Sequence, residues 1–212
     1  MKPTPDYFLY LVTDAVLAGP RGVMAVVQAA VTGGVSVVQL RDKSADGRAL
    51  LAQARELAEW LRPRDVTFIV NDRVDLALAC DADGVHVGQS DLPCTVVRRL
   101  VGPDRLVGVS VGSVAEAVQA ERDGADYLGV SPVFATSTKP DAPPAVGLDG
   151  LRAIRAAVRL PLVAIGGLHS GNAAEVLAAG ADGLAVVSAI MAAADPAAAA
   201  RQLRACRGCR AC

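Results

Sequence analysis

The sequence predicts an α/β protein that folds as a single (β/α)8 barrel of the TIM type. Short β-branched runs alternate with longer Ala- and Leu-rich stretches along the 212 residues. Eight parallel strands, each followed by a helix, close into a barrel. The competing architecture is an open doubly wound sheet. No Gly-x-Gly-x-x-Gly turn follows the first strand, which ends Leu11-Val12-Thr13-Asp14, and this disfavours the open sheet.

The expected strands are short apolar runs bounded by glycine or polar residues. They lie at Phe8–Thr13, Val35–Leu40, Thr67–Asn71, Gly84–Val87, Leu106–Ser110, Tyr127–Ser131, Leu162–Ile165 and Gly183–Val187. The expected helices show apolar residues three and four positions apart. They lie at Val23–Thr32, Gly47–Leu61, Val74–Ala79, Val114–Asp123, Leu148–Val158, Asn172–Ala179 and Pro196–Cys206. Two connections share the letters Gly-Ala-Asp, at residues 124–126 and 180–182, which indicates a repeated unit with a short turn into the next strand.

The composition supports a packed core and limits the function classes. Apolar residues make up 52% and charged residues 20%, which excludes intrinsic disorder. Lys and Arg total 21 against 22 Asp and Glu, so the net charge is 21 − 22 = −1. This balance argues against a nucleic-acid partner but permits a local positive pocket for a small anion.

The chain is expected to act in the cytoplasm without a membrane partner. Residues 1–6 lack the apolar segment of an export signal, and the apolar run Gly183–Ala194 is too short to span a bilayer. An odd count of 5 cysteines favours reduced thiols. We expect one barrel domain over residues 1–205 and a Cys-rich tail over 206–212. The spacing of Cys206, Cys209 and Cys212 permits a metal or Fe–S ligand set, but exposed thiols are the default interpretation.

The carboxyl ends of the strands are where a barrel of this kind places its active residues. At the second strand, alternation puts Gln39, Arg41 and Lys43 on one side. Val38 and Leu40 lie on the other side, which meets the helices. An amide and two cations at the barrel mouth favour a phosphate ligand, and the alternative is an exposed loop with ordinary charges.

Two acids follow the third and fourth strands. Asp72 and Asp91 lie in adjacent loops, and carboxylates in this arrangement can hold a Mg²⁺ that also binds phosphate oxygens. Each acid alone could instead be a helix N-cap, and Asp91 before Leu92-Pro93 resembles one. His86 alternates with buried-type valines and is expected to be a satisfied interior histidine.

The remaining strands supply a second set of anion-binding groups. Ser110 ends the fifth strand. A polar loop after the sixth strand carries Thr136, Ser137, Thr138 and Lys139. Its length and polarity suit a lid over the site, and the alternative interpretation is a solvated linker. Gly166-Gly167 and Val187-Ser188 follow the seventh and eighth strands. Backbone N–H groups at these two positions form the phosphate site of many such barrels.

The chemistry expected from these groups is electrostatic. The sequence offers no evident Ser-His-Asp set and no lysine within a strand for a Schiff base. A leaving pyrophosphate neutralised by cations, beside a second phosphorylated substrate, fits two anion sites at one barrel mouth.

Five motifs occur in order along the chain, and together they resemble one family. They are Gln39-Leu40-Arg41-Asp42-Lys43, Asn71-Asp72-Arg73, Gly84-Val85-His86-Val87-Gly88-Gln89-Ser90-Asp91, Ala135-Thr136-Ser137-Thr138-Lys139 and Ile165-Gly166-Gly167. In this order they resemble the thiamine-phosphate synthase (thiamine-phosphate pyrophosphorylase) family over about residues 7–192. The resemblance implies a Mg²⁺-dependent transferase that joins a hydroxymethylpyrimidine pyrophosphate to a thiazole phosphate and releases pyrophosphate by a dissociative path.

The resemblance also implies residue roles. Asp72 and Asp91 are the expected Mg²⁺ ligands, and the expected catalytic residues are Arg41, Lys43, Ser110 and Lys139. The expected substrate-binding residues are Gln39, Leu40, Arg41, Asp42, Lys43, Asn71, Ser110, Thr136, Ser137, Thr138, Lys139, Gly167, Val187 and Ser188.

One departure from the family pattern separates the synthase from its relatives. Gly112 stands where the family often has histidine, and a related thiazole tautomerase relies on that histidine and lacks the metal aspartates. Gly112 together with Asp72 and Asp91 therefore favours the synthase. The alternatives are a tautomerase-like paralogue and a non-catalytic phosphate-binding barrel that regulates a partner.

Overall fold

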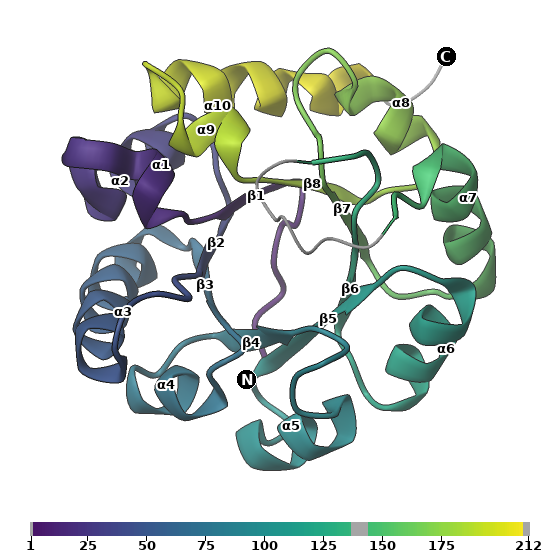
Figure 1. Ribbon diagram of the computed structural model, residues 1–212, viewed down its shortest axis with the longest axis horizontal. Coiled ribbons are helices and arrows are strands. Elements are labelled where there is room, and N and C mark those ends of the chain that lie inside the picture. Colours follow the sequence, from purple (N-terminus) through teal and green to yellow (C-terminus); the bar gives the residue numbers. More distant parts are fainter. Residues whose placement is uncertain (1, 137–143, 210–212) are drawn as a thin grey trace.

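Eight parallel strands form a closed barrel in chain order, surrounded by helices (Figure 1). The computed structural model describes residues 2–136 and 144–209. The strands are β1 Leu9–Val12, β2 Val37–Leu40, β3 Thr67–Asn71, β4 Gly84–Val87, β5 Leu106–Val111, β6 Tyr127–Val130, β7 Leu162–Ile165 and β8 Gly183–Val186. The predicted barrel is confirmed, because β8 pairs with β1 and leaves no open edge between first and last strands.

The helices cover the outside of the barrel. They are α1 Ala15–Ala18, α2 Gly22–Thr32, α3 Gly47–Leu61, α4 Val74–Ala79, α5 Cys94–Val101, α6 Val114–Arg122, α7 Gly147–Ala157, α8 Ala173–Ala178, α9 Ser188–Met191 and α10 Pro196–Ala205, with 3₁₀ turns η1 Gly19–Arg21, η2 Arg62–Arg64 and η3 Cys206–Cys209. Helix α5 is not among the helices predicted from the sequence. Its buried positions Cys94, Val97 and Val101 have helical spacing, but the β-branched run Thr95-Val96-Val97 obscures it.

Strand alternation divides the core into two layers. Outward-facing residues such as Leu11, Val38 and Val70 pack against the helices. Inward-facing residues fill the barrel, with Tyr10 and Tyr127 among the largest fully buried side chains. Burying each aliphatic side chain contributes about 1.5–3 kcal/mol, so the alternation fixes which face of every strand points inward.

A repeated aspartate ties the start of one strand to the next. Asp83, Asp126 and Asp182 each lie just before β4, β6 or β8. Each carboxylate accepts an N–H from near the start of the preceding strand, and the donors are Phe68 N (2.7 Å), Val107 N (2.8 Å) and Leu162 N (2.9 Å). These contacts give a physical reason for the Ala-Asp pairs in the sequence, because each satisfies a backbone donor at the barrel base.

The N-terminal helical stretch is apolar enough to pass as a membrane span. Residues 15–32 meet that criterion by length and composition, whereas the apolar run noted in the sequence is residues 183–194. In the structure the stretch is interrupted by η1, where Gly19 and Gly22 have φ of 58° and 75°. The buried face of α2 packs in the outer core, between the helices and the strands.

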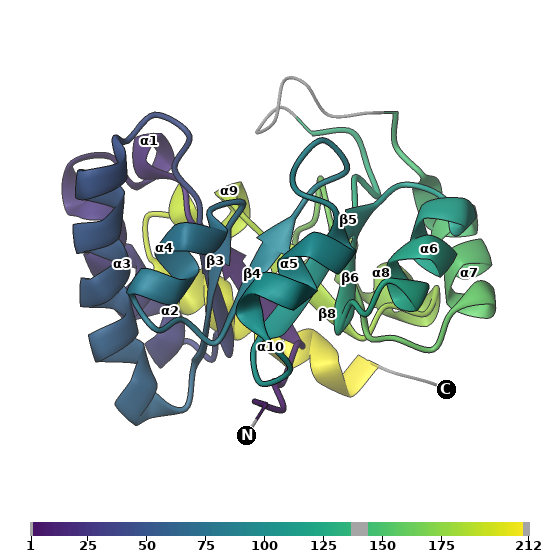
Figure 2. The same ribbon diagram turned by 90° about the horizontal axis from the view of Figure 1, so that it is seen from below.

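The two ends of the barrel have different roles. The N-terminus and α10 lie toward one end, at the bottom of Figure 2. The strands run toward the opposite end, where the loops after their carboxyl ends surround the cavity described below. Parallel strands therefore bring residues far apart in sequence to one rim.

Candidate active site

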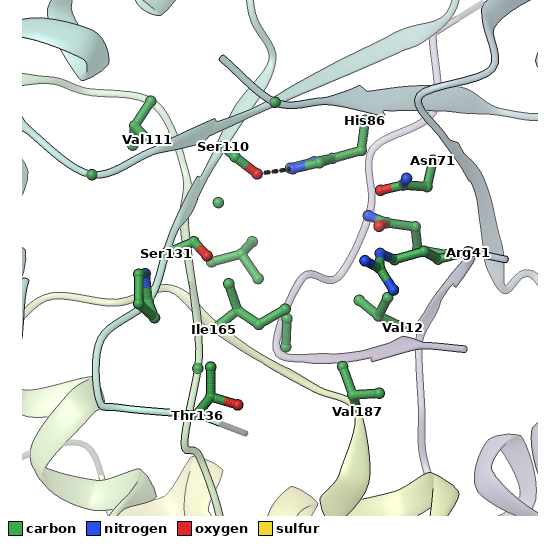
Figure 3. Close-up of a pocket in the computed structure, with 18 of the residues that line it drawn as sticks. Val12, Arg41, Asn71, His86, Ser110, Val111, Ser131, Thr136, Ile165 and Val187 are labelled. Atoms are coloured by element: carbon green, nitrogen blue, oxygen red, sulfur yellow. Dashed lines mark hydrogen bonds between the residues drawn. The ribbon is translucent and has the colours of Figure 1, made fainter. Parts of the chain in front are cut away.

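A cavity of about 660 Å³ occupies the carboxyl end of the barrel (Figure 3). It receives side chains from the strand ends and from the loops that follow them. The sequence-predicted site residues that line it are Gln39, Arg41, Lys43, Asn71, Asp72, Asp91, Ser110, Thr136, Gly167, Val187 and Ser188. Ser137, Thr138 and Lys139 lie outside the described residues.

Leu40 and Asp42 belong to the same motif but do not line the cavity. Leu40 is 1% exposed and packs in the outer core against the helices. The Asp42 carboxylate accepts the backbone N–H groups of Ser44 (2.8 Å) and Ala45 (3.0 Å). Strand alternation accounts for the difference, since only every second residue faces the barrel interior.

The side of the cavity that carries Arg41 and Lys43 is held in place by the residue that follows β1. The backbone N–H of Arg41 donates to the Thr13 hydroxyl at 3.0 Å, which holds the end of β2 against β1. Lys43 Nζ lies 3.7 Å from Asp72 Oδ2, so this ammonium group already faces the acidic side of the cavity.

The acidic side of the cavity is a carboxylate pair. Burial and a hydrogen bond with Asp91 raise the pKa of Asp72 to about 6, because two like charges resist ionising together. The Asp91 carboxylate accepts the N–H of Gly88 at 2.8 Å. It does not cap α5, whose N-cap residue is Pro93. Asp72 has φ of 60°, and its N–H donates to His86 O at 2.8 Å.

The floor of the cavity is a hydrogen-bonded chain of buried polar side chains. Gln39 Nε2 donates to the Tyr10 hydroxyl (2.7 Å), which lies 2.8 Å from the Tyr127 hydroxyl. The Tyr127 hydroxyl lies 3.0 Å from His86 Nδ1, and His86 Nε2 lies 2.9 Å from Ser110 Oγ. Burial lowers the pKa of His86 to about 4, so its imidazole is neutral near pH 7.

Three residues that line the cavity are not among the site residues predicted from the sequence. Tyr10 and Tyr127 line the cavity, as does Gln89, whose side-chain amide donates to Ser110 O at 2.7 Å. The alternation of Tyr10 with Leu9 and Leu11 is the signal that would have placed it inside the barrel. His86 is the interior histidine that alternation predicts, and it also faces the cavity (Figure 3).

The glycine pair after β7 is crowded by the chain itself. A Cβ on Gly166 would lie 2.5 Å from Pro132 Cβ, and one on Gly167 would lie 2.8 Å from Ala135 O. Both glycines have positive φ, 105° and 66°. Glycine is required at both positions because the segment after β6 occupies the space that a Cβ would need.

Gly112 and Glu116 line the cavity at the end of β5. Glu116 Oε2 accepts the N–H of Gly112 at 2.6 Å, and Ser113 Oγ accepts the N–H of Glu116 at 3.2 Å. This reciprocal arrangement resembles a capping box at the start of α6. It explains the carboxylate of Glu116 as a structural group of the cavity wall.

Among residues 2–136 and 144–209, no group of three or more His, Cys, Asp or Glu side chains is placed to hold a metal ion. The two carboxylates of Asp72 and Asp91 nevertheless fit a Mg²⁺ that takes its other oxygens from water and phosphate. The raised pKa of Asp72 marks the electrostatic cost of the pair, which a divalent cation would relieve.

The fold and site define a (β/α)8 barrel whose mouth suits an anionic ligand. Residues 9–190 match the family model described as thiamine monophosphate synthase, and the chain belongs to this family. It is 60% identical to the thiamine-phosphate synthase of Chloroflexus aurantiacus, covering 94% of this chain and 92% of that protein. It is 54% identical to the enzyme of the same name from Moorella thermoacetica, covering 94% and 95%.

Solved structures agree with the family assignment. The thiamine phosphate pyrophosphorylase of Pyrococcus furiosus superposes with a TM-score of 0.88 at 41% identity, covering 98% of each chain. A 3-hexulose-6-phosphate synthase superposes with a TM-score of 0.66 at 21% identity, covering 94% of this chain and 99% of that one, and this likeness shows the fold alone.

Proposed function

We propose that the chain is a thiamine-phosphate synthase. It joins 4-amino-2-methyl-5-(diphosphooxymethyl)pyrimidine to 4-methyl-5-(2-phosphoethyl)thiazole and releases pyrophosphate; with the carboxylated form of the thiazole, CO2 is released as well. The observation that carries this proposal is the meeting of Arg41, Lys43 and Asp72 at one cavity rim. The family of the chain and the names of its relatives support the same substrates.

The cationic residues act on the leaving group. As the carbon–oxygen bond breaks, negative charge develops on the pyrophosphate oxygens, and fixed cations lower the energy of that state. Arg41 and Lys43 are the described residues proposed for this role, and Lys139, outside the described residues, completes it. Gln39, Asn71 and Ser110 hold the pyrimidine diphosphate. Leu40 and Asp42 belong to the same motif, but neither lines the cavity.

Asp72 and Asp91 are proposed to hold Mg²⁺. When bound, this ion would supply positive charge to the diphosphate oxygens. The protein's own contribution is to hold both carboxylates at one rim, with Asp91 fixed by Gly88 N at 2.8 Å and Asp72 facing Lys43. This arrangement orients the diphosphate end of the substrate toward the cations.

The second substrate occupies the other side of the cavity. Gly167, Val187, Ser188 and Thr136 line that side and are proposed to hold the thiazole phosphate, with Ser137 and Thr138 beyond the described residues. The attacking group is the lone pair of the thiazole nitrogen, which forms the new carbon–nitrogen bond after the pyrophosphate departs. That nitrogen has no proton to lose, so the bond-forming step requires no general base.

The proposal includes a cytoplasmic, metal-dependent enzyme acting on small phosphorylated molecules. Cys80 and Cys94 are buried free thiols, which suits a reducing compartment. The Mg²⁺ requirement and the compartment both remain parts of the proposal that experiments can test separately from the reaction itself.

The direct experiment mixes both phosphorylated substrates with the purified chain and Mg²⁺. Pyrophosphate and the coupled product should appear in equal amounts, measured by a phosphate assay coupled to inorganic pyrophosphatase and by mass spectrometry. Omitting the thiazole phosphate should remove the coupled product. Product formation that is unchanged in EDTA would contradict the metal role, and absence of product at high enzyme concentration would contradict the function.

A further inference from the structure

The buried polar chain on the cavity floor links two residues proposed to bind substrate. It begins at Gln39, passes through Tyr10, Tyr127 and His86, and ends at Ser110, with four contacts of 2.7–3.0 Å. Tyr10 and Tyr127 are 1% and 0% exposed. Water therefore does not compete for these contacts, and each contact needs a hydrogen from one of its two partners.

The number of available hydrogens decides which partner donates in each of these hydrogen bonds. Gln39 donates to Tyr10 through Nε2, so the remaining partner for the Tyr10 hydrogen on the floor is the Tyr127 oxygen. Tyr127 then donates to His86 Nδ1. Because Nδ1 accepts from Tyr127 it carries no hydrogen, so the imidazole N–H lies on Nε2 and donates to Ser110 Oγ. The Ser110 hydroxyl keeps its own hydrogen for a ligand, and Gln39 keeps its carbonyl oxygen.

The alternative is that every hydrogen bond on the cavity floor runs in the opposite direction, with Ser110 as the first donor. If Ser110 donated to His86, every link would reverse, and Tyr10 would have to donate to Gln39. Gln39 would then need to present its oxygen to Tyr10, whereas the structure has Nε2 at 2.7 Å. The two ends of the chain are therefore linked, because one end presents an acceptor to the cavity only when the other presents a donor.

Two inward-facing glycines make room for the central contact. A Cβ on Gly108 would lie 2.4 Å from the Tyr127 hydroxyl and 2.5 Å from His86 Nδ1. A Cβ on Gly129 would lie 3.0 Å from His86 Cε1. Any side chain at residue 108 would thus occupy the space in which Tyr127 and His86 meet.

We propose that Tyr10, Tyr127 and His86 are positioning residues that make the Ser110 hydroxyl a hydrogen-bond donor and the Gln39 carbonyl an acceptor toward the cavity. This polarity complements an aminopyrimidine, which offers an amino donor and ring-nitrogen acceptors. A 4-oxo pyrimidine reverses the donor and acceptor pattern along that edge. The inference rests on the proposed function only for the identity of this ligand.

The donor direction along these buried hydrogen bonds can be measured without substrate. The protein has 2 histidines, so ¹⁵N-histidine labelling gives two imidazole signals, and a His169→Gln variant identifies the exposed one. At neutral pH we expect His86 to be the Nε2–H tautomer, with an acceptor-type shift at Nδ1. An Nδ1–H tautomer, or a doubly protonated ring, would overturn the proposal.

The functional consequence can be measured as a ratio. The 4-amino and 4-oxo pyrimidine diphosphates are compared by kcat/KM in the wild-type chain and in Tyr127→Phe, which removes two links. We expect the preference for the amino form to fall roughly tenfold, which corresponds to about 1.4 kcal/mol. Tyr10→Phe breaks the chain elsewhere and should lower the same ratio, which provides a second variant if Tyr127→Phe folds poorly.

Tyr7→Phe is the matched control. Tyr7 stacks on Tyr127 with ring centroids 4.8 Å apart, but it takes no part in the four contacts of the chain. The amino-to-oxo ratio should be unchanged in this variant. An unchanged ratio in both Tyr127→Phe and Tyr10→Phe would overturn the proposal while leaving the synthase function intact. Lack of turnover in the wild type would contradict the function alone, since the tautomer measurement is independent of it.

Discussion

Lys43 Nζ and Asp72 Oδ2 lie 3.7 Å apart, so the loops after β2 and β3 meet through opposite charges at the cavity rim. Asp72 also faces Asp91, and this second contact is repulsive because both side chains are carboxylates. Burial and Asp91 together raise the pKa of Asp72 to about 6 from an ordinary value of 3.8. The rim is thus a site where the fold tolerates unfavourable charge, which is typical of functional positions.

Removing the Asp72 charge should stabilise the protein above pH 6. A carboxyl group with a raised folded pKa stabilises the fold below about pH 4, and that contribution is lost as the pH rises through 6. At pH 8 we expect the free energy of unfolding of Asp72→Asn to exceed that of the wild type by on the order of 2 kcal/mol. Thermal unfolding at pH 4 and pH 8 measures the difference, which should nearly vanish at pH 4.

Magnesium should narrow this difference in stability between the wild type and Asp72→Asn. Adding Mg²⁺ at pH 8 should raise the wild-type melting temperature by a few degrees and leave Asp72→Asn unchanged, because the variant lacks one of the two proposed ligands. The reference condition is a buffer that contains EDTA and no added Mg²⁺. Equal stabilisation of both proteins by Mg²⁺ would place the ion elsewhere.

Lys43 should contribute to catalysis with little effect on stability. Its side chain is 58% exposed and its ion pair with Asp72 is long, so Lys43→Gln should change the free energy of unfolding by less than about 0.5 kcal/mol. We expect kcat/KM for the pyrimidine diphosphate to fall by roughly 10- to 100-fold, as loss of one charge-stabilising group typically gives. A large fall in melting temperature would show that Lys43 is mainly structural.

The glycines of the cavity wall should differ in their tolerance of a methyl group. Gly166→Ala forces φ of 105° on alanine and places its Cβ 2.5 Å from Pro132, so we expect a loss of about 2–4 kcal/mol. Gly112→Ala is the control, since its nearest atom is Ser131 O at 3.5 Å and its φ is not in the glycine region. Urea denaturation of both variants measures the contrast, and similar losses would contradict the packing argument.

The aspartate before β6 should stabilise the base of the barrel. Asp126 accepts Val107 N at 2.8 Å and pairs with Lys2 at 2.7 Å and with Arg98. Asp126→Ala removes the side-chain acceptor of Val107 N and the ion-pair partner of Lys2, while Arg98 keeps its bonds to Gly124 O and Gly102 O, and it should cost about 2–3 kcal/mol. Asp149→Ala removes a 99% exposed partner of Arg152 and should cost almost nothing. Chemical denaturation compares the two, with activity at low temperature as a check that the site is preserved.

Local pattern was sufficient for the fold and for the motif-bearing strand ends. The helix Gly47–Leu61 has the predicted bounds because its apolar spacing and its Asp46 cap are both local signals. The same alternation that placed Gln39 and Arg41 on the inner face also separates them from Leu40. Helix α5 was missed because its valines suit a strand as well as a helix.

The sequence by itself determined the eightfold alternation, the polar residues at strand ends and the glycines that only certain turns accept. Tertiary structure decided which of these groups meet. Tyr10 and Tyr127 are 117 residues apart and touch at 2.8 Å, and no local period encodes that contact. Barrel closure fixes the stagger between strands, and therefore which inward side chains share a level. Sequence periodicity specifies the face of a strand, whereas only the closed sheet specifies the neighbour across it.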